Sequence, residues 1–229
     1  MIETTSRPAP SSVIRSIYIV DDHPLIRESM IALITRQPDL RVCGQAGDSD
    51  AAFGEISAKE PDALILDLSL PGESGLELIK RLQALPKPPK ILVLSMHDES
   101  VYAERVLRAG ALGYVMKHET TDKVLEAVRR VLLGKAYVSG AFASQLAERL
   151  AGVTGPWKTS IEAALSDREL EVFRLIGQGR GTRKIAEELG VSIKTVQTHC
   201  ARMKEKLGVS SALALAREAV RWSERDSIS

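Results

Sequence analysis

An aspartate, Asp67, follows directly on the apolar run of residues 63–66, and turn-forming residues come immediately after it. In a buried parallel strand, this pattern places the carboxylate where the backbone leaves the sheet. Ligand and reaction sites of open α/β sheets lie outside these carboxyl ends of the strands. We therefore interpret Asp67 as a nucleophile that accepts a phosphoryl group.

Two further carboxylates, Asp21 and Asp22, end the first apolar run of the chain. In a doubly wound sheet this strand is a neighbour of the one that ends at Asp67, so three carboxylates converge. Like charges repel one another unless a cation joins them, and Mg²⁺ prefers oxygen ligands. We predict a Mg²⁺ site with Asp22 and Asp67 as direct ligands, Asp21 acting through water, and the backbone carbonyl of Ser69 as a further oxygen.

A hydroxyl and an ammonium group complete the set of side chains at this sheet edge. Ser95 ends the fourth apolar run and Lys117 follows the fifth. Lys117 and the metal would neutralise the equatorial oxygens of a transferring phosphoryl group, and Ser95 would donate a hydrogen bond to one of them. Each residue alone is more often a helix cap, a turn residue or a solvated side chain; the combination is what favours phosphoryl transfer.

The elements that must position these residues alternate between strand and helix patterns. We expect strands over residues 13–20, 40–46, 63–66, 91–94 and 113–115. We expect helices over residues 25–36, 49–59, 76–85, 100–109 and 121–133. This alternation predicts an α/β fold, a doubly wound five-stranded parallel sheet covered by helices on both faces. A short helix carrying Phe142, Leu146 and Leu150 follows, and residues 151–156 have the composition of a hinge.

The last segment reads as all helical. Ser166 and Glu169 match a capping box that starts a helix ending near Gly177. A second helix over residues 182–189, a Gly turn, a third helix capped by Ser192 and ending before Gly208, and a fourth over residues 211–222 follow. Two helices joined by a short turn containing Gly form a helix-turn-helix, so the chain has a second, all-α domain.

The third of these helices has two distinct faces. At 100° per residue, one stripe is apolar and should pack on the second helix: Val196, Cys200, Met203 and Leu207. On the other side, Gln197 could read adenine, Thr198 could contact a thymine, and Ala201 leaves a small side chain in the groove. The remaining polar residues are better placed for phosphates: Lys184, Lys194, Thr195 and Arg202. A solvated amphipathic helix is the alternative, and the capped helix, Gly turn and basic excess together favour DNA.

Composition limits the class of protein. The net charge of +1 divides into −2 for residues 1–145 and +3 for residues 146–229, a basic excess that suits nucleic acid. No apolar run reaches the roughly 20 residues of a membrane span, so we expect no membrane association. Cys43 and Cys200 do not form a spaced pair, which favours free thiols and a cytoplasmic location. The Pro- and Ser-rich residues 1–13 should be disordered.

Residues 14–134 resemble a bacterial receiver domain. The resemblance is carried by Asp21-Asp22-His23-Pro24, by residues 67–72 with Gly75, by Ser95, and by Tyr114 to Lys117. It implies the strand order 2-1-3-4-5 and phosphorylation of Asp67 by a sensor histidine kinase or a small phosphodonor. It also implies a switch in which Ser95 moves toward the phosphoryl group and Tyr114 rotates inward, although Tyr114 is equally well explained as a half-buried core aromatic. His118 stands where many receivers have proline, and we expect it at the surface.

Residues 160–224 resemble a LuxR-type DNA-binding domain. The resemblance is carried by residues 165–169, 184–186, 194–199 and 206–209. The whole chain is therefore similar to a NarL/FixJ-type response regulator, with a receiver at 14–134, a linker with a short helix at 135–160 and a helix-turn-helix domain at 161–229. The family implies homodimers on paired DNA half-sites when phosphorylated, and RNA polymerase is a candidate partner.

Two rival hypotheses come from other classes. A Mg²⁺-dependent phosphohydrolase with an aspartyl nucleophile often needs a carboxylate two residues after the nucleophile, where this chain has Ser69. A protein-interaction switch would use the helical domain to bind a partner protein instead of DNA. The leading prediction is a transcription regulator that is not an enzyme and whose DNA binding depends on phosphorylation.

Overall fold

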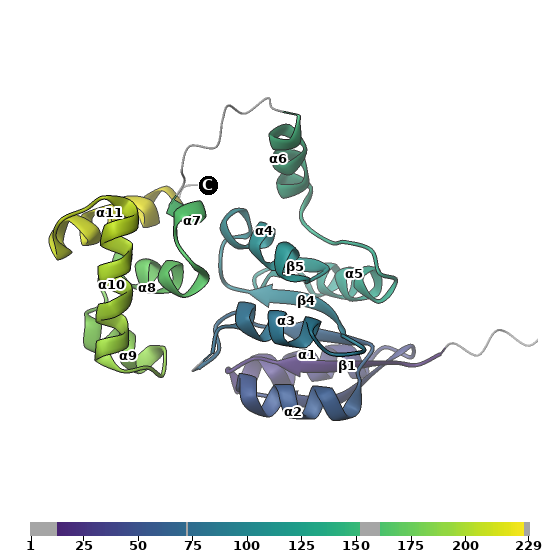
Figure 1. Ribbon diagram of the computed structural model, residues 1–229. Helices are drawn as coiled ribbons and strands as arrows, with labels where there is room; N and C mark the ends of the chain where they lie inside the picture. The colour runs from purple at the N-terminus through teal and green to yellow at the C-terminus, as the bar shows by residue number, and fades with distance from the viewer. Residues whose placement is uncertain (1–12, 72, 152–160, 227–229) are drawn as a thin grey trace, which may run out of the picture.

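The computed structural model describes residues 13–71, 73–151 and 161–226. Figure 1 shows an α/β part, formed by β1–β5 and α1–α5, and a helical part, formed by α7–α11. Residues 1–12, for which we predicted disorder together with Val13, lie outside these ranges. The same holds for Gly72 and for the predicted hinge from residue 152 onwards.

A five-stranded sheet is the centre of the α/β part. All of its strand pairs are parallel, and their order is β2-β1-β3-β4-β5, which confirms the predicted fold class. The strands are β1 (Arg15–Val20), β2 (Leu40–Ala46), β3 (Ala63–Leu66), β4 (Lys90–Ser95) and β5 (Gly113–Met116). The first strand starts two residues later than predicted, because Val13 and Ile14 are exposed rather than packed.

Helices cover both faces of this sheet, and each face has its own core. Alternate residues of β1 point to opposite sides: Ile17 and Ile19 belong to one buried cluster, and Tyr18 and Val20 belong to the other. The helices are α1 (Pro24–Thr35), α2 (Ser49–Lys59), α3 (Gly75–Gln83), α4 (Glu99–Ala109) and α5 (Thr121–Leu132). Burial on both faces explains why the strands read as continuous apolar runs.

The helical part matches the predicted helix-turn-helix. Its helices are α7 (Ile161–Ala164), α8 (Asp167–Gly177), α9 (Thr182–Glu188), α10 (Ile193–Leu207) and α11 (Ala212–Asp226), and α6 (Gly140–Leu150) precedes them. The capping box of Ser166 and Glu169 is present, and Ser192 accepts a hydrogen bond from the backbone of Thr195. The sequence did not predict the short helix α7, and it ended α11 several residues too early.

The predicted apolar stripe of α10 faces the core, and its positions differ in depth: Val196 and Met203 are buried, whereas Cys200 and Leu207 are half-buried. Val196 and Met203 are fully buried, and they share a core with Ile185, Ala186 and Leu189. Gly208 ends the helix in the left-handed conformation, with φ of 65°, which a glycine adopts without steric cost. Packing of α10 against α8 and α9 therefore determines which face of α10 remains exposed.

Within the described ranges, no helix is both long enough and apolar enough to span a membrane.

Gly75 has a steric requirement that bears directly on Asp67. A Cβ atom at Gly75 would lie 2.5 Å from the carbonyl oxygen of Asp67 and 2.7 Å from the Cα atom of Leu68. Both neighbours are backbone atoms, so they cannot rotate away. We expect Gly75→Ala to lower the free energy of unfolding by about 1–3 kcal/mol, measured by chemical denaturation.

Gly54 is the matched control, because it lies within α2 and a Cβ atom there would have no neighbour within 4 Å. Gly54→Ala should raise the free energy of unfolding by about 0.5–1 kcal/mol through the higher helix propensity of alanine. Equal stability of Gly75→Ala and the wild type would contradict the crowding at the Asp67 loop.

Glu169 is a buried carboxylate that joins α8 to α10. Its side chain accepts hydrogen bonds from the Lys206 ammonium, at 2.6 Å, and from the Ser166 backbone, at 2.8 Å. Burial opposes ionisation, but these hydrogen bonds outweigh it and hold the pKa of Glu169 below its usual 4.5. A carboxylate whose pKa is lowered on folding stabilises the protein above the unfolded-state pKa, and this contribution is lost as the pH falls through the folded-state pKa.

We therefore expect Glu169→Gln to reduce the free energy of unfolding at pH 7 by about 1–3 kcal/mol, the usual range for hydrogen bonds to charged groups. The difference from the wild type should shrink as the pH falls below 4.5. Urea denaturation between pH 7 and pH 3 measures it. Glu205→Gln, at an exposed position of α10, is the control and should change little. A pH-independent difference for Glu169→Gln would rule out the ionised carboxylate as its cause.

Candidate functional sites

The predicted carboxylates converge at the carboxyl ends of β1 and β3. Asp21 and Asp67 are each only 3% exposed, and Asp22 lies beside them at the surface. The ligand atoms of Asp21, Asp22, His23 and Asp67 all lie within 4.8 Å of one another. The strand order brings them together, since β1 and β3 are hydrogen-bonded neighbours. We name this set, together with Lys117, the acidic pocket.

Lys117 supplies the positive charge of the acidic pocket. Its Nζ atom lies 2.6 Å from Asp21 Oδ2 and 2.7 Å from Asp67 Oδ2, and its side chain is 5% exposed. Burial favours a neutral lysine, but the two carboxylates outweigh this effect and raise the pKa of Lys117 above its usual value. Burial also raises the pKa of Asp67, against the effect of Lys117 and of a hydrogen bond from the Ser69 backbone. One ammonium group thus serves two buried carboxylates.

His23 is a member of the acidic pocket that the sequence analysis did not include. Its Nδ1 atom lies 2.5 Å from Asp22 Oδ1, and its backbone N–H donates to Asp21 Oδ1 at 2.9 Å. The signal was present in the sequence, because His23 follows the aspartate pair directly. The side chain is largely exposed and lies at the rim of the pocket.

The donor chemistry of the acidic pocket fits the magnesium ion that receiver domains bind. Asp21, Asp22 and Asp67 offer carboxylate oxygens within one small volume, which is the ligand type that Mg²⁺ prefers. Two of these carboxylates are buried, and a divalent cation would offset the cost of placing like charges together.

Ser95 and Tyr114 form a second group beside the acidic pocket. Ser95 is fully buried, and its Oγ accepts a hydrogen bond from the His97 backbone at 3.2 Å. Tyr114 is 1% exposed, and its hydroxyl donates to the His97 carbonyl at 2.7 Å. Tyr114 is therefore fully inside, and not the half-buried aromatic of the alternative expectation. His97 joins the two residues, although no pattern in the sequence had marked it as a site residue.

The backbone connects this second group to the acidic pocket. The Lys117 N–H donates to the Ser95 carbonyl at 2.8 Å. No cis peptide bond occurs among the residues that the structure describes, so the Lys117–His118 bond is trans. His118 is exposed, as predicted.

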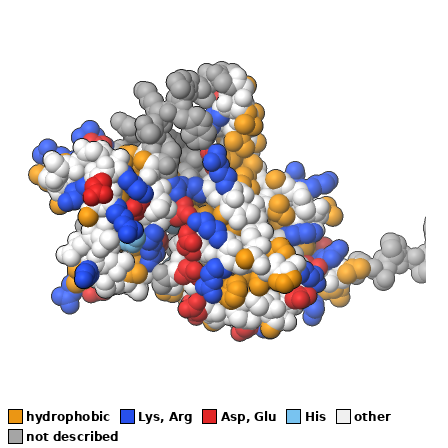
Figure 2. Space-filling view, viewed as in Figure 1, with side chains coloured by type: hydrophobic (Ala, Val, Ile, Leu, Met, Phe, Trp, Pro, Cys, Tyr) orange, Lys and Arg blue, Asp and Glu red, His pale blue; other side chains and the backbone are white. Residues whose placement is uncertain are grey.

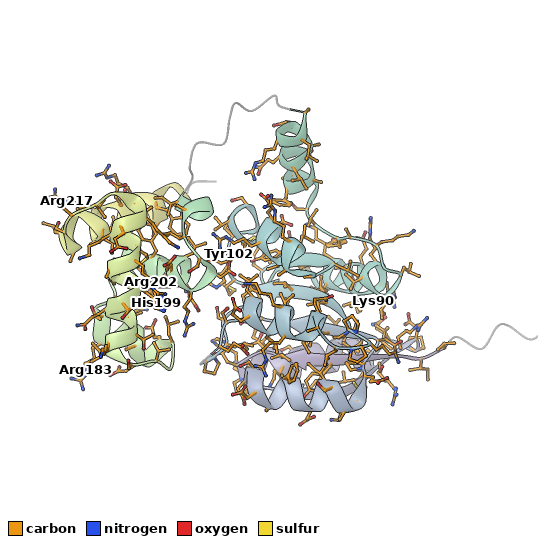
Figure 3. All side chains as sticks on the ribbon, viewed as in Figure 1. Lys90, Tyr102, Arg183, His199, Arg202 and Arg217 are labelled. Atoms are coloured by element: carbon orange, nitrogen blue, oxygen red, sulfur yellow. The ribbon has the colours of Figure 1, made fainter. Side chains whose placement is uncertain are left out.

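The second candidate site is the outward face of α9 and α10. Most of its predicted DNA contacts are exposed: Lys184, Lys194, Gln197, Thr198, Ala201 and Arg202. Figure 2 shows Lys and Arg side chains spread over the helical part, and Figure 3 labels Arg183 on α9 with His199 and Arg202 on α10. Within the described ranges, Lys184, Lys194 and Arg202 have no acidic partner, which leaves their charges available.

Two predicted contacts are already partly engaged within the helix. Thr195 is half-buried, and its Oγ1 atom lies 2.8 Å from Ser192 Oγ in the helix cap. Thr198 donates its hydroxyl to the Lys194 carbonyl at 2.9 Å, so its methyl group and oxygen lone pair remain for a ligand. His199, on the same helix, is half-buried.

Each of the two parts of the chain matches a known protein family. The family model of the response regulator receiver domain matches residues 17–129, and the model of the bacterial regulatory proteins of the luxR family matches residues 163–219. The oxygen regulatory protein NreC of Staphylococcus carnosus is 36% identical over 209 residues, which span 90% of this chain and 96% of NreC. NreC of Staphylococcus aureus is also 36% identical, over 214 residues.

The chain is also similar to solved structures of response regulators. RcsB from Salmonella enterica serovar Typhimurium, bound to promoter rprA in the presence of phosphomimetic BeF3⁻, has a TM-score of 0.61 and 28% identity, covering 89% of this chain and 97% of RcsB. A LuxR-family response regulator from Aurantimonas sp. SI85-9A1 has a TM-score of 0.56 and 33% identity, covering 60% of this chain and 99% of that protein.

The fold, the acidic pocket and the helix-turn-helix together define a transcription regulator controlled by phosphorylation. The chain belongs to the NarL/FixJ-type bacterial response regulators, which join a receiver domain to a LuxR-type DNA-binding domain.

Proposed function

We propose that Asp67 is the residue that accepts the phosphoryl group in this response regulator. The observation that carries the proposal is the position of the Lys117 ammonium, 2.7 Å from Asp67 Oδ2 and 2.6 Å from Asp21 Oδ2. Asp21 shares burial and the contact with Lys117, but among the carboxylates of the acidic pocket only Asp67 directly follows β3, the middle strand of the sheet. From this position the Lys117 ammonium would stabilise the charge that develops on the phosphoryl oxygens during transfer.

The chemistry is an in-line transfer to a carboxylate oxygen. An Asp67 oxygen forms a bond to phosphorus while the bond between phosphorus and a histidine nitrogen of a sensor kinase breaks, and the leaving imidazole keeps the electron pair. The same step with a small phosphodonor releases its leaving group instead. The product remains on the protein, so we assign the chain a role as acceptor and not as an enzyme with turnover.

Mg²⁺ is the cation that we assign to the acidic pocket. Asp22 and Asp67 would bind it directly, Asp21 through water, and the Ser69 backbone carbonyl would supply a further oxygen. When bound, the ion would neutralise charge on the phosphoryl oxygens. Ser95 would then donate a hydrogen bond to one of these oxygens. We propose that Ser95 and Tyr114 are the two residues that change conformation when Asp67 is phosphorylated.

The helix-turn-helix is proposed to place α10 in the major groove. Gln197, Thr198 and Ala201 would face base edges. The residues proposed for phosphates are Lys184, Lys194, Thr195 and Arg202. Support comes from the exposure of this face and from the RcsB structures, which are bound to promoter DNA.

Phosphorylation would shift a two-state equilibrium toward a homodimer bound to paired half-sites, with RNA polymerase as a further candidate partner. We propose domain limits of 14–134, 135–160 and 161–229, which enclose both family matches. The free thiols of Cys43 and Cys200 support a reducing compartment such as the cytoplasm.

Two alternatives would be revived by specific results. Multiple turnover of a small phosphoester would favour the phosphohydrolase, for which Ser69 lacks the needed carboxylate. Salt-independent binding, or binding only to protein, would favour the interaction switch, because DNA affinity through phosphates falls steeply with salt.

The nucleophile is tested by phosphate labelling. With Mg²⁺ and a radiolabelled small phosphodonor, the wild type should take up acid-stable, base-labile label, and Asp67→Ala should take up none. Removal of Mg²⁺ with a chelator should reduce labelling of the wild type by at least about tenfold, since a metal contact is worth several kcal/mol. Asp122→Ala, at an exposed position of α5, is the control and should label normally. Equal labelling of Asp67→Ala and the wild type would show that the nucleophile lies elsewhere.

The DNA-binding face is tested by two substitutions with different expected effects. Lys194→Ala should weaken binding to all sequences and reduce the salt slope of the binding constant by about one. Gln197→Ala should relax preference at one base pair by about 1–3 kcal/mol and leave the salt slope unchanged. Electrophoretic or fluorescence titration on genome-selected sites measures both. Lys135→Ala, exposed on the α/β part, is the control. Unaltered affinity and preference in both variants would exclude α10 as the reading helix.

A further inference from the structure

His97 holds together the two loops that carry Asp67 and Ser95. Ser69 lies two residues after Asp67, and His97 lies two residues after Ser95. The Nε2 atom of His97 lies 3.0 Å from Ser69 Oγ, so one hydrogen bond joins the loop after β3 to the loop after β4. The width of the gap between Asp67 and Ser95 is therefore fixed in part by this bond.

The backbone of His97 makes two further contacts with the switch residues. Its N–H donates to Ser95 Oγ at 3.2 Å, and its carbonyl accepts from the Tyr114 hydroxyl at 2.7 Å. Any movement of the Ser95 hydroxyl toward a group on Asp67 must break its hydrogen bond with the His97 N–H or move the His97 peptide with it. His97 is thus coupled to both residues by separate hydrogen bonds.

The other side of the His97 ring faces the helical part. The ring stacks on Tyr102 of α4, with centroids 4.6 Å apart and planes inclined by 22°. Figure 3 labels Tyr102 near the boundary between the two parts. His97 and Tyr102 also line a small cavity with two residues of α8, Asp167 and Glu171. The imidazole therefore lies between the acidic pocket and α8.

Charged contacts hold the start of α8 in this position. The Arg105 guanidinium on α4 contacts the Asp167 carboxylate and donates to the Leu165 carbonyl at 2.8 Å. Lys80 on α3 lies 3.1 Å from the same carboxylate. Asp167 and Glu171 are one helical turn apart, so a single face of α8 rests on the α/β part.

Burial determines the ionisation state of His97. It lowers the pKa of the imidazole to about 3, with further lowering by Arg174 and Lys117. The ring is therefore neutral near pH 7, with one nitrogen that donates and one that accepts. Its hydrogen bond with Ser69 is directional, and a phenyl ring could not replace it.

We propose that His97 is a positioning residue that transmits the state of the acidic pocket to helix α8. The inference rests on the proposed phosphorylation of Asp67 and adds the route by which the helical part detects it. When Ser95 turns toward the phosphoryl group, the His97 peptide shifts with it, and the ring moves against Ser69 and Tyr102. The surface on which Asp167 and Glu171 rest then changes, and α8 is loosened.

The test measures hydrogen exchange of the α8 amides in the full chain, with and without beryllofluoride, the phosphoryl mimic present in the RcsB complex. In the wild type, beryllofluoride with Mg²⁺ should reduce protection of α8 by about tenfold, the size expected from loss of one buried hydrogen bond. His97→Phe keeps an aromatic ring against Tyr102 but removes the bond to Ser69, and its α8 should respond by less than about twofold. His97→Gln can restore the bond and should recover most of the response.

Two further variants separate positioning from folding. Ser69→Ala breaks the same bond from the other loop and should match His97→Phe, and the double variant should add nothing further. His118→Phe makes the same change at an exposed histidine and should respond as the wild type does. A full wild-type response in both His97→Phe and Ser69→Ala would overturn the inference while leaving Asp67 as acceptor. If wild-type protein takes no label at Asp67, the inference falls together with the proposed function.

Discussion

The contact of one lysine with two buried aspartates is the constraint on which the α/β part depends. Lys117 Nζ lies within 2.7 Å of a carboxylate oxygen of Asp67, and even closer to Asp21. Two carboxylates at this depth would repel each other without a cation, and removing one member of a buried charged set is strongly destabilising. The strands β1, β3 and β5 must therefore end at the same level, which a parallel sheet in the order 2-1-3-4-5 achieves.

The same arrangement also supports the chemistry that we propose for the acidic pocket. Asp67, which we propose as the nucleophile, is buried beside an ammonium group and lies where Lys117 and a metal could share the charge of a transferring phosphoryl group. Gly75 contributes sterically, because only a residue without Cβ lets α3 begin against the carbonyl of Asp67. The close packing of Gly75 against the Asp67 backbone thus helps to set the position of the Asp67 carboxylate.

The helical part is joined to this pocket by few but specific contacts. Asp167 of α8 forms ion pairs with Arg105 and Lys80. The outward face of α10 is exposed and takes no part in these contacts. On the receiver side, the His97 backbone is hydrogen-bonded to Ser95 and Tyr114, the proposed switch residues, and His97 lines a small cavity together with Asp167 of α8. A response regulator needs such a connection, because a change of charge on one carboxylate must alter the position of a whole domain.

The sequence by itself determined the fold class, the helix-turn-helix, and the convergence of Asp21, Asp67 and Lys117, because apolar periodicity and strand-end residues are local patterns in the chain. It also predicted the burial of Val196 and Met203 on one face of α10. Only the tertiary structure decided what depends on distant segments: the place of His23 at the pocket rim, the inward position of Tyr114, the hydrogen bond from His97 to the loop that carries Ser69, and the contact of Asp167 with Arg105. The physical reason is that charged and polar residues such as Asp167 look solvated along the chain, and only docking of another element buries them.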